Sequence, residues 1–130
     1  MRIIKFRGKD IDTGDWVFGD LHTLCDRPHI HTEPSSFPYA GKRSFVNQET
    51  IGQFTSLYDK HHKEIYEGDI LKVGNIGLLE VRFVRGVFAF LWDGDLDNES
   101  PTGSPTHEWA EVVGNIHDNP NLIKKGGKNG

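Results

Sequence analysis

The segment that most constrains the fold lies between residues 68 and 92, "GDILKVGNIGLLEVRFVRGVFAFLW". Short apolar runs alternate in it with tight glycine turns, and this pattern predicts three consecutive antiparallel strands, a β-meander. In the middle run Leu79 and Val81 alternate with Glu80, as in a strand with two unlike faces. The last run, residues 87–92, is apolar on both faces, which suits a central strand. The segment therefore indicates a β-rich protein.

The first residues predict a β-hairpin around the turn "DTGD", residues 12–15, in which the glycine provides a positive φ. Strand alternation places Ile4 and Phe6 on one side of the first strand. The basic residues of this strand fall on the other side: Lys5, Arg7 and Lys9. Trp16 and Phe18 share a face of the return strand, and we expect that face to meet Ile4 and Phe6.

The middle of the chain has weaker signals. Residues 22–44 contain three prolines and no sustained periodicity, so we expect a long excursion with a short strand near Cys25. Residues 44–59 are strand-like again, with a short helical turn at their start as an alternative. The acidic stretch 93–107 predicts a loop, and residues 108–118 predict the last strand.

The end of the chain and its length suggest the domain organisation. The Asn119–Pro120 pair is a helix-start signal, and residues 124–130 have nothing to bury, which predicts a disordered tail. A chain of 130 residues suits one small core. We expect one β-rich domain over residues 1–123, or two small lobes over about 1–60 and 61–123.

The composition limits the cellular compartments and the classes of partner that we expect for this protein. The net charge of −4 argues against a protein dominated by nucleic-acid electrostatics, although a local basic face is compatible with it. The single cysteine excludes an intramolecular disulfide and indicates a reducing interior. No apolar run approaches the roughly 20 residues of a membrane helix, and the first residues become polar too soon for a signal peptide. We expect a cytoplasmic protein with no membrane partner.

Three blocks carry a family resemblance: "KFRGKDIDTGDWVFGDL", "IGQFTSLYDKHHKEIYEGDIL" and "EVVGNIHDNPNLI". In this order and spacing they resemble the YopX protein family, small proteins encoded by phages and prophages. The resemblance implies a mainly β fold of antiparallel, coiled and bifurcated sheets forming pseudo-barrels, with little helix, and it makes homo-oligomers plausible. It brings no assigned biochemical role and no catalytic residues. Residues 22–46 and 74–107 carry none of it.

Members of that family tend to have Asn-Gly in the turn where this chain has His61-His62. Asn-Gly suits a two-residue hairpin turn, so His62 would have to adopt a positive φ here. Adjacent histidines point to opposite sides of a strand and make a poor chelate, so we expect turn residues rather than a metal or acid–base site. The following "EGDIL" predicts a bend at Gly68, with Asp69 bonded to local backbone.

Two other sets of side chains suit metal ions by type, but neither completes a coordination shell. His29 and His31 share a face if their segment is extended, and Cys25 is near in sequence, yet we expect exposed loop histidines. Three acidic residues match the first, third and fifth positions of a calcium loop: Asp93, Asp95 and Asp97. The twelfth position holds Ser104 instead of a bidentate Glu, which favours a solvated acidic loop. We expect no metal and no other cofactor.

Basic residues give the one signal for a partner. We expect the cations of the first strand to lie near Lys42 and Arg43, and a second group is in the tail: Arg2, Lys5, Arg7 and Lys9, then Lys124, Lys125 and Lys128. A β surface with basic and aromatic residues suits single-stranded nucleic acid, whereas a solvated strand face and tail is the simpler interpretation. Any nucleic-acid binding should be weak and salt-dependent.

No nucleophile elbow, P-loop or HExxH motif is present, so we expect no enzyme. The sequence favours a phage-derived, non-enzymatic binding or assembly module. A nucleic-acid-binding accessory protein is the alternative, followed by a small metal-dependent hydrolase. The run "GVFAFLW" has large side chains on both faces, and sheet edges need covering, so we expect a homo-oligomer, with a phage or host protein as another partner.

Overall fold

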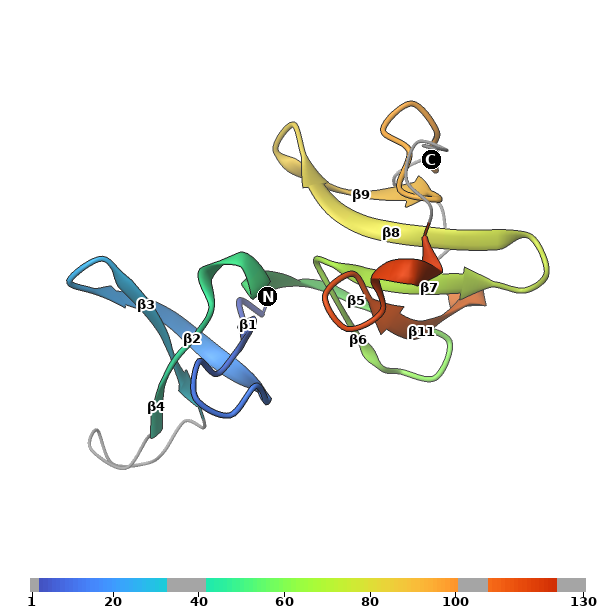
Figure 1. The fold of residues 1–130 in the computed structure, drawn as a ribbon. Coiled ribbons are helices and arrows are strands. Elements are labelled where there is room, and N and C mark those ends of the chain that lie inside the picture. Colours follow the sequence, from blue (N-terminus) through green and yellow to red (C-terminus); the bar gives the residue numbers. More distant parts are fainter. Residues whose placement is uncertain (1–2, 33–41, 101–107, 124–130) are drawn as a thin grey trace. The chain divides into compact units, whose positions relative to one another are not determined.

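The structure is a computed structural model and describes residues 3–32, 42–100 and 108–123. Antiparallel strands dominate it (Figure 1), so the prediction of a mainly β fold is confirmed. The strands form bent sheets that do not close into barrels within these described ranges.

The contacts between residues divide the chain into two compact units, Met1–Phe54 and Thr55–Gly130. Their boundary falls inside strand β5, Gly52–Tyr58, and so precedes the boundary near residue 60 that we considered for two lobes. The tail, residues 124–130, lies outside the described residues.

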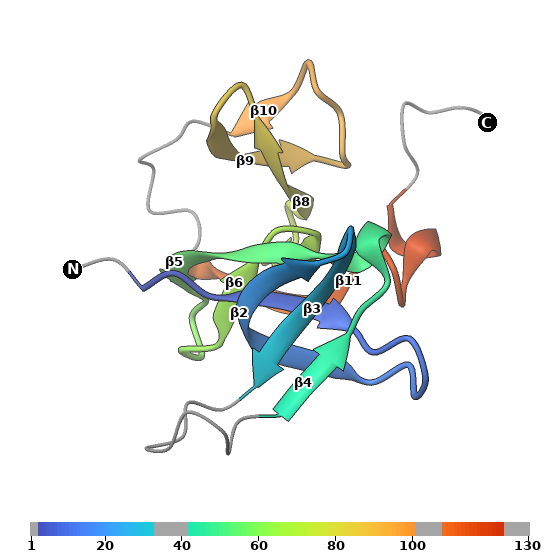
Figure 2. The ribbon, with the colours of Figure 1, turned by 90° about the vertical axis from the view of Figure 1, so that its left-hand side faces the viewer.

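The first unit contains four strands besides the start of β5: β1 Phe6–Lys9, β2 Trp16–Leu24, β3 Arg27–Thr32 and β4 Lys42–Phe45. Together with β5 they form a sheet in the order β4-β3-β2-β1-β5 (Figure 2). The chain after β4 returns to β1 through a bridge between Asp10 and Val46. A Cβ on Gly8 would lie 3.0 Å from the Val46 Cβ, so only glycine allows this close approach. Ile30 and Val46 are almost fully buried in this unit.

The expected excursion over residues 22–44 is wrong for its described part. Strand β2 continues to Leu24, and β3 returns directly after a two-residue turn formed by Cys25 and Asp26, since Leu24 pairs with Arg27. Both turn residues have positive φ, 52° and 63°, as a tight hairpin turn demands. Neither is glycine, so the usual sequence signal for such a turn is missing. Residues 33–41 lie outside the described structure.

The first hairpin forms as predicted, but its expected register is wrong. Trp16 pairs with Lys9 and Phe18 pairs with Arg7, so the two aromatic residues lie on the basic side of β1 and not on the side of Phe6. The turn is closed by bonds between Asp10 N and Asp15 O and between Gly14 N and Asp10 O, both 2.9 Å. A shift of register by one residue exchanges the faces of a strand, and this turn selects the register seen.

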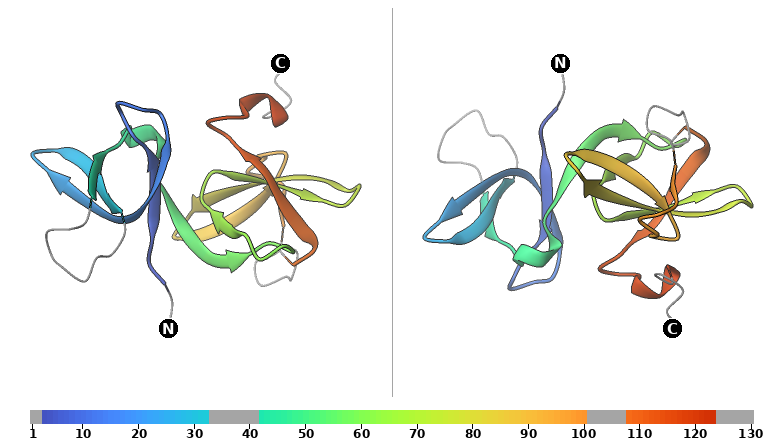
Figure 3. Two further views of the ribbon diagram at one scale, coloured as in Figure 1. Left: turned by 90° about the horizontal axis from the view of Figure 1, so that it is seen from below. Right: turned by 90° about the horizontal axis from the view of Figure 1, so that it is seen from above.

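Six strands lie in the second unit after β5: β6 Glu64–Tyr66, β7 Asp69–Val73, β8 Gly77–Val84, β9 Val87–Trp92, β10 Glu99–Ser100 and β11 Ala110–Asn115. Strand β6 pairs with β5, and the others form a sheet in the order β10-β9-β8-β7-β11, four strands of which are labelled in Figure 1. Figure 3 shows the ribbon from below and from above. The predicted meander and last strand are confirmed.

The core of the second unit lies on one face of the meander. Leu71, Leu79 and Val81 are fully buried there and pack with Phe90 and Ile65. On the other face Ala89 and Leu91 of β9 are also fully buried. The central position expected for this strand is therefore confirmed.

Helical structure in the described residues is limited to short 3₁₀ turns. The turn η1, Gln48–Thr50, confirms the helical alternative, and the side chain of Asn47 caps it by accepting from Glu49 N at 3.0 Å. The predicted helix start is found at η3, Pro120–Leu122, although the Asn119 side chain does not cap it. A helix long and apolar enough to cross a membrane is absent from the described residues.

Candidate nucleic-acid interface

One face of the first unit gathers cationic and aromatic side chains. Residues directly opposite one another in antiparallel strands share a face, so the pairs Lys9–Trp16, Arg7–Phe18, His22–His29 and His31–Arg43 define it. We call it the basic–aromatic face, and alternation along the strands gives its members: Lys5, Arg7, Lys9, Trp16, Phe18, Asp20, His22, Arg27, His29, His31, Arg43 and Phe45.

Trp16 attracts two cations of this face. The guanidinium carbon of Arg7 lies 4.5 Å from the centre of a Trp16 ring, and Lys9 Nζ lies 5.5 Å from it. Both distances are within the range of cation–π attraction. Arg7 is buried, with 6% of its surface exposed, whereas Trp16 is half-buried. The centre of the hairpin therefore holds a desolvated cation against an aromatic ring.

The same alternation of cation and ring recurs at both ends of the face. Lys5 Nζ lies 5.5 Å from the Phe54 ring, and the guanidinium carbon of Arg27 lies 4.2 Å from the Phe45 ring. Phe18 is 44% exposed. The exposed charged side chains on the face are those of Asp20, Arg27 and Arg43. Solvent thus reaches an aromatic ring and cations of more than one strand.

Three histidines complete the face. The ring centroids of His22 and His29 are 5.5 Å apart and the rings are stacked, while His31 lies 4.8 Å from His22 and 5.3 Å from His29. The predicted common face of His29 and His31 is confirmed. The expectation of exposed loop histidines is wrong, because both lie in β3 and His29 is 5% exposed. Burial lowers the pKa of His29, and the nearby Arg43, His31 and His22 lower it further.

The predicted nucleic-acid residues separate into two groups. Lys5, Arg7, Lys9 and Arg43 are brought together on the basic–aromatic face. Lys42 occupies the neighbouring position of β4, where it pairs with Thr32, and its side chain lies outside the described structure. The sequence did not single out Arg27, His22 or Phe45 for this face. Alternation along β2 places His22 with Trp16 and Phe18, whereas Arg27 joins the face through the two-residue turn at Cys25 and Asp26, and Phe45 through the pairing of β4 with β3.

A cavity of about 580 Å³ adjoins the basic–aromatic face. Two cations of that face, Lys9 and Arg27, take part in its lining. The other lining residues come from the first two hairpin turns, from β3 and from the segment after β4: Asp10, Ile11, Gly14, Asp26, Pro28, Val46, Asn47 and Gln48. The cavity is large enough for part of a small ligand, and its lining combines two cations with the carboxylates of Asp10 and Asp26.

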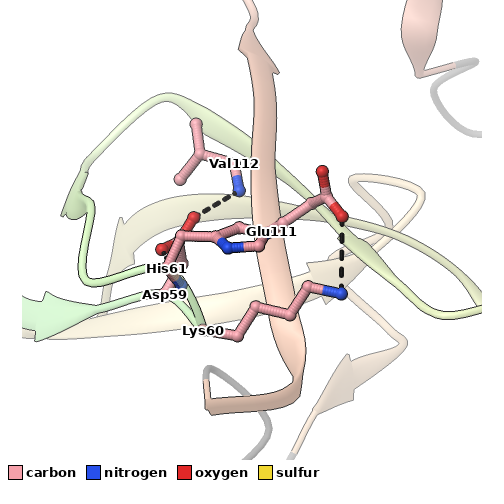
Figure 4. Close-up of polar contacts among 5 residues, drawn as sticks. All are labelled: Asp59, Lys60, His61, Glu111 and Val112. Carbon is pink, nitrogen blue, oxygen red and sulfur yellow. Dashed lines mark hydrogen bonds and ion pairs between the residues drawn. The ribbon is translucent and has the colours of Figure 1, made fainter.

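The His61-His62 turn of the second unit is built around Asp59 (Figure 4). Asp59 Oδ1 accepts from the backbone N–H groups of His61 at 2.8 Å and Lys63 at 2.9 Å. Asp59 Oδ2 accepts from Val112 N at 2.9 Å. Burial alone would raise the pKa of Asp59, but these hydrogen bonds outweigh it and hold the pKa below its usual value. His62 has a φ of 63°, so the turn prediction is confirmed.

The remaining polar signals are also structural. Gly68 has a φ of 96°, and Asp69 Oδ2 accepts from Tyr66 N at 2.7 Å, as predicted for that bend. In the acidic stretch, Asp95 Oδ1 accepts from Asp97 N at 2.9 Å, which closes a local turn. Within the described ranges, no group of three or more His, Cys, Asp or Glu is arranged to hold a metal ion.

The profile of the YopX protein family matches residues 5–124. The chain belongs to the YopX family. The match includes residues 22–46 and 74–107, which lie outside the three sequence blocks and showed no resemblance by themselves. The crystal structure of protein EF1440 from Enterococcus faecalis resembles this YopX protein over 95% of this chain and 100% of that chain, with a TM-score of 0.59 and 22% sequence identity. This likeness concerns the fold alone. A comparison with curated proteins finds no match.

Proposed function

We propose that this YopX protein is a non-enzymatic binding module of phage or prophage origin that acts in the cytoplasm and binds single-stranded nucleic acid through its basic–aromatic face. The observation that carries the proposal is the register of the first hairpin. It places Trp16 and Phe18 among Arg7 and Lys9, although simple alternation led us to expect them on the opposite face. Cations that track phosphates beside rings that stack on bases are the usual combination in single-strand binding.

The acidic net charge does not oppose this proposal, because it is unevenly distributed. Residues 1–54 hold seven Lys and Arg against seven Asp and Glu, whereas residues 55–130 hold eight against twelve. The whole net charge of −4 therefore belongs to the second unit. On the basic–aromatic face itself, five cations accompany one carboxylate, that of Asp20. A local positive field of this kind is sufficient for weak, salt-dependent binding.

A single strand suits the face better than a duplex. Base–aromatic stacking needs unpaired bases, and Phe18 is exposed for it. The cations lie on a sheet, with Arg27 and Arg43 on strands other than that of Lys9. A flexible backbone can follow such a surface across several strands. The binding should therefore tolerate different sequences and respond strongly to salt.

Fluorescence anisotropy tests the proposal. Labelled oligothymidylate of about 20 nucleotides and a duplex of the same length would be titrated between about 50 and 200 mM salt. We expect the single strand to bind more tightly than the duplex, with an affinity that falls steeply as salt rises. The variant R43Q should weaken binding severalfold and reduce the salt slope by about 1. The matched control K72Q removes an exposed cation of β7 in the second unit and should bind as the wild type does.

The variant F18L separates stacking from charge. Its exposed ring can be removed with little effect on the core, and the loss of stacking on one base should weaken single-strand binding by about tenfold. Duplex binding should change little. Equal affinities of the wild type, R43Q and F18L, or a preference for duplex, would show that the face is not a single-strand site.

A further inference from the structure

We propose that the histidine cluster His22–His29–His31 makes the binding of single-stranded nucleic acid proton-dependent, so that the affinity rises as pH falls from about 7.5 to about 5.5. This inference rests on the proposed function and adds a regulation of the same face. Histidine is the side chain whose charge ordinarily changes in this range. Three of the seven histidines of the chain meet in one patch of this face.

The geometry of the cluster follows from its two strands. His22 of β2 lies directly opposite His29 of β3, and His31 is two residues further along β3 on the same face. The three ring centroids are between 4.8 and 5.5 Å apart. At such distances a charge on His31 or His22 opposes a charge on His29. An anion bound beside the cluster would offset this repulsion.

The other charges around the cluster are mostly positive. Arg43 of β4 lies directly opposite His31, and Arg27 of β3 is two residues before His29. Asp20 of β2, opposite His31 on the other side, is the one carboxylate among the described members of the face. On β1, Arg7 adds a further cation opposite Phe18. The charge of Arg43 opposes a proton on His29, and a phosphate strand across the face would offset that charge.

The members of the cluster have different surroundings. His22 is exposed and His31 is half-buried, so both can approach a phosphate. His29 is buried against the Phe45 ring, with its centroid 5.4 Å away, and its Nδ1 has no hydrogen-bond partner among the described residues. Burial lowers the pKa of His29, which opposes a proton on this ring. We therefore assign the response to pH to His22 and His31, which solvent and a phosphate can reach.

The test compares two double variants with equal numbers of histidines. Anisotropy titrations with labelled oligothymidylate would be run at about pH 5.5, 6.5 and 7.5, at one ionic strength, with the whole chain. The variant H22Q/H31Q removes the sensing residues and spares the buried His29. The control H61Q/H62N removes two exposed histidines of the second unit, and so shows the effect of losing any two histidine charges at low pH.

The wild type and H61Q/H62N should bind about tenfold more tightly at the lowest pH than at the highest, while H22Q/H31Q should show a much smaller change. Calorimetry at about pH 6.5 in two buffers of different ionisation enthalpy should show proton uptake on binding by the wild type, but little by H22Q/H31Q. Circular dichroism would verify that both variants are folded.

Two outcomes overturn the inference in distinguishable ways. If binding is lost in R43Q but the pH dependence is the same in the wild type and H22Q/H31Q, the proposed function stands and the histidine regulation fails. If oligothymidylate does not bind at any pH, the proposed function and this inference fail together.

Discussion

The carboxylate of Asp59 accepts a hydrogen bond of 2.9 Å from the backbone N–H of Val112, 53 residues later in the sequence. The neighbouring Lys60 N donates to Ala110 O at 2.9 Å, and Lys60 Nζ lies 3.5 Å from Glu111 Oε1. These contacts, two of which Figure 4 shows, cover the outer side of β11, which is an edge strand of its sheet. An uncovered edge offers free backbone groups to another chain. The His61-His62 turn thus protects a sheet edge.

The first prediction concerns the loss of this protection. The variant D59A removes the acceptor of three backbone hydrogen bonds and leaves their donors partly buried, which should cost about 3 kcal/mol in the free energy of unfolding. Urea denaturation measures it. The control D97A removes an exposed carboxylate of the same unit and should change stability by less than about 0.5 kcal/mol. A loss in D59A no larger than in D97A would contradict the role of Asp59.

The second prediction is the pH dependence that Asp59 imposes. Its pKa is lowered in the folded state, so the unfolded chain binds the proton more readily. The stabilisation is therefore complete above the unfolded pKa of about 4 and is lost as pH falls through the folded pKa. The difference in unfolding free energy between the wild type and D59N should be constant from about pH 7 to 5 and shrink below about pH 4. A difference that is already shrinking at pH 6 would contradict this account.

The third prediction concerns strain in the same turn. His62 has a φ of 63°, a conformation that glycine adopts without steric cost. Replacing His61-His62 with Asn-Gly should leave the free energy of unfolding equal or raise it by a fraction of a kcal/mol, because the bonds to Asp59 come from backbone groups. The control K60G introduces glycine at a residue without positive φ and should destabilise the protein. A loss of several kcal/mol in the Asn-Gly variant would show that the imidazoles themselves are needed.

The fourth prediction is self-association. We expect a homo-oligomer. The apolar run of β9 does not support this expectation, because Ala89 and Leu91 are already buried within the unit. The large exposed side chains of the second unit, Trp109 at 68% and Phe83 at 53%, are better candidates for a contact between copies. Light scattering at increasing micromolar concentration should show a mass above 14.7 kDa. A mass that stays monomeric throughout would remove the oligomer.

Features that depend on neighbouring residues could be predicted from the sequence. The meander β7–β8–β9 follows from apolar runs and tight turns, and each of its hydrogen-bonded pairs joins segments close in the chain. The bend at Gly68 and Asp69 and the positive φ of His62 are local for the same reason. In all three cases the deciding interaction lies within a few residues of the pattern that reveals it.

The basic–aromatic face could not be predicted in full, because register is a tertiary property. Whether Trp16 meets Phe6 or Lys9 depends on one residue of register, and the bonds of Asp10 across the first turn select it. His22 joins His29 because Cys25 and Asp26 accept positive φ, which they have no strong preference to do on their own. The sequence by itself determined which strands can form and which residues alternate along each. The tertiary structure decided which faces coincide, since hydrogen bonds between strands, and not the side chains of either strand alone, set the pairing.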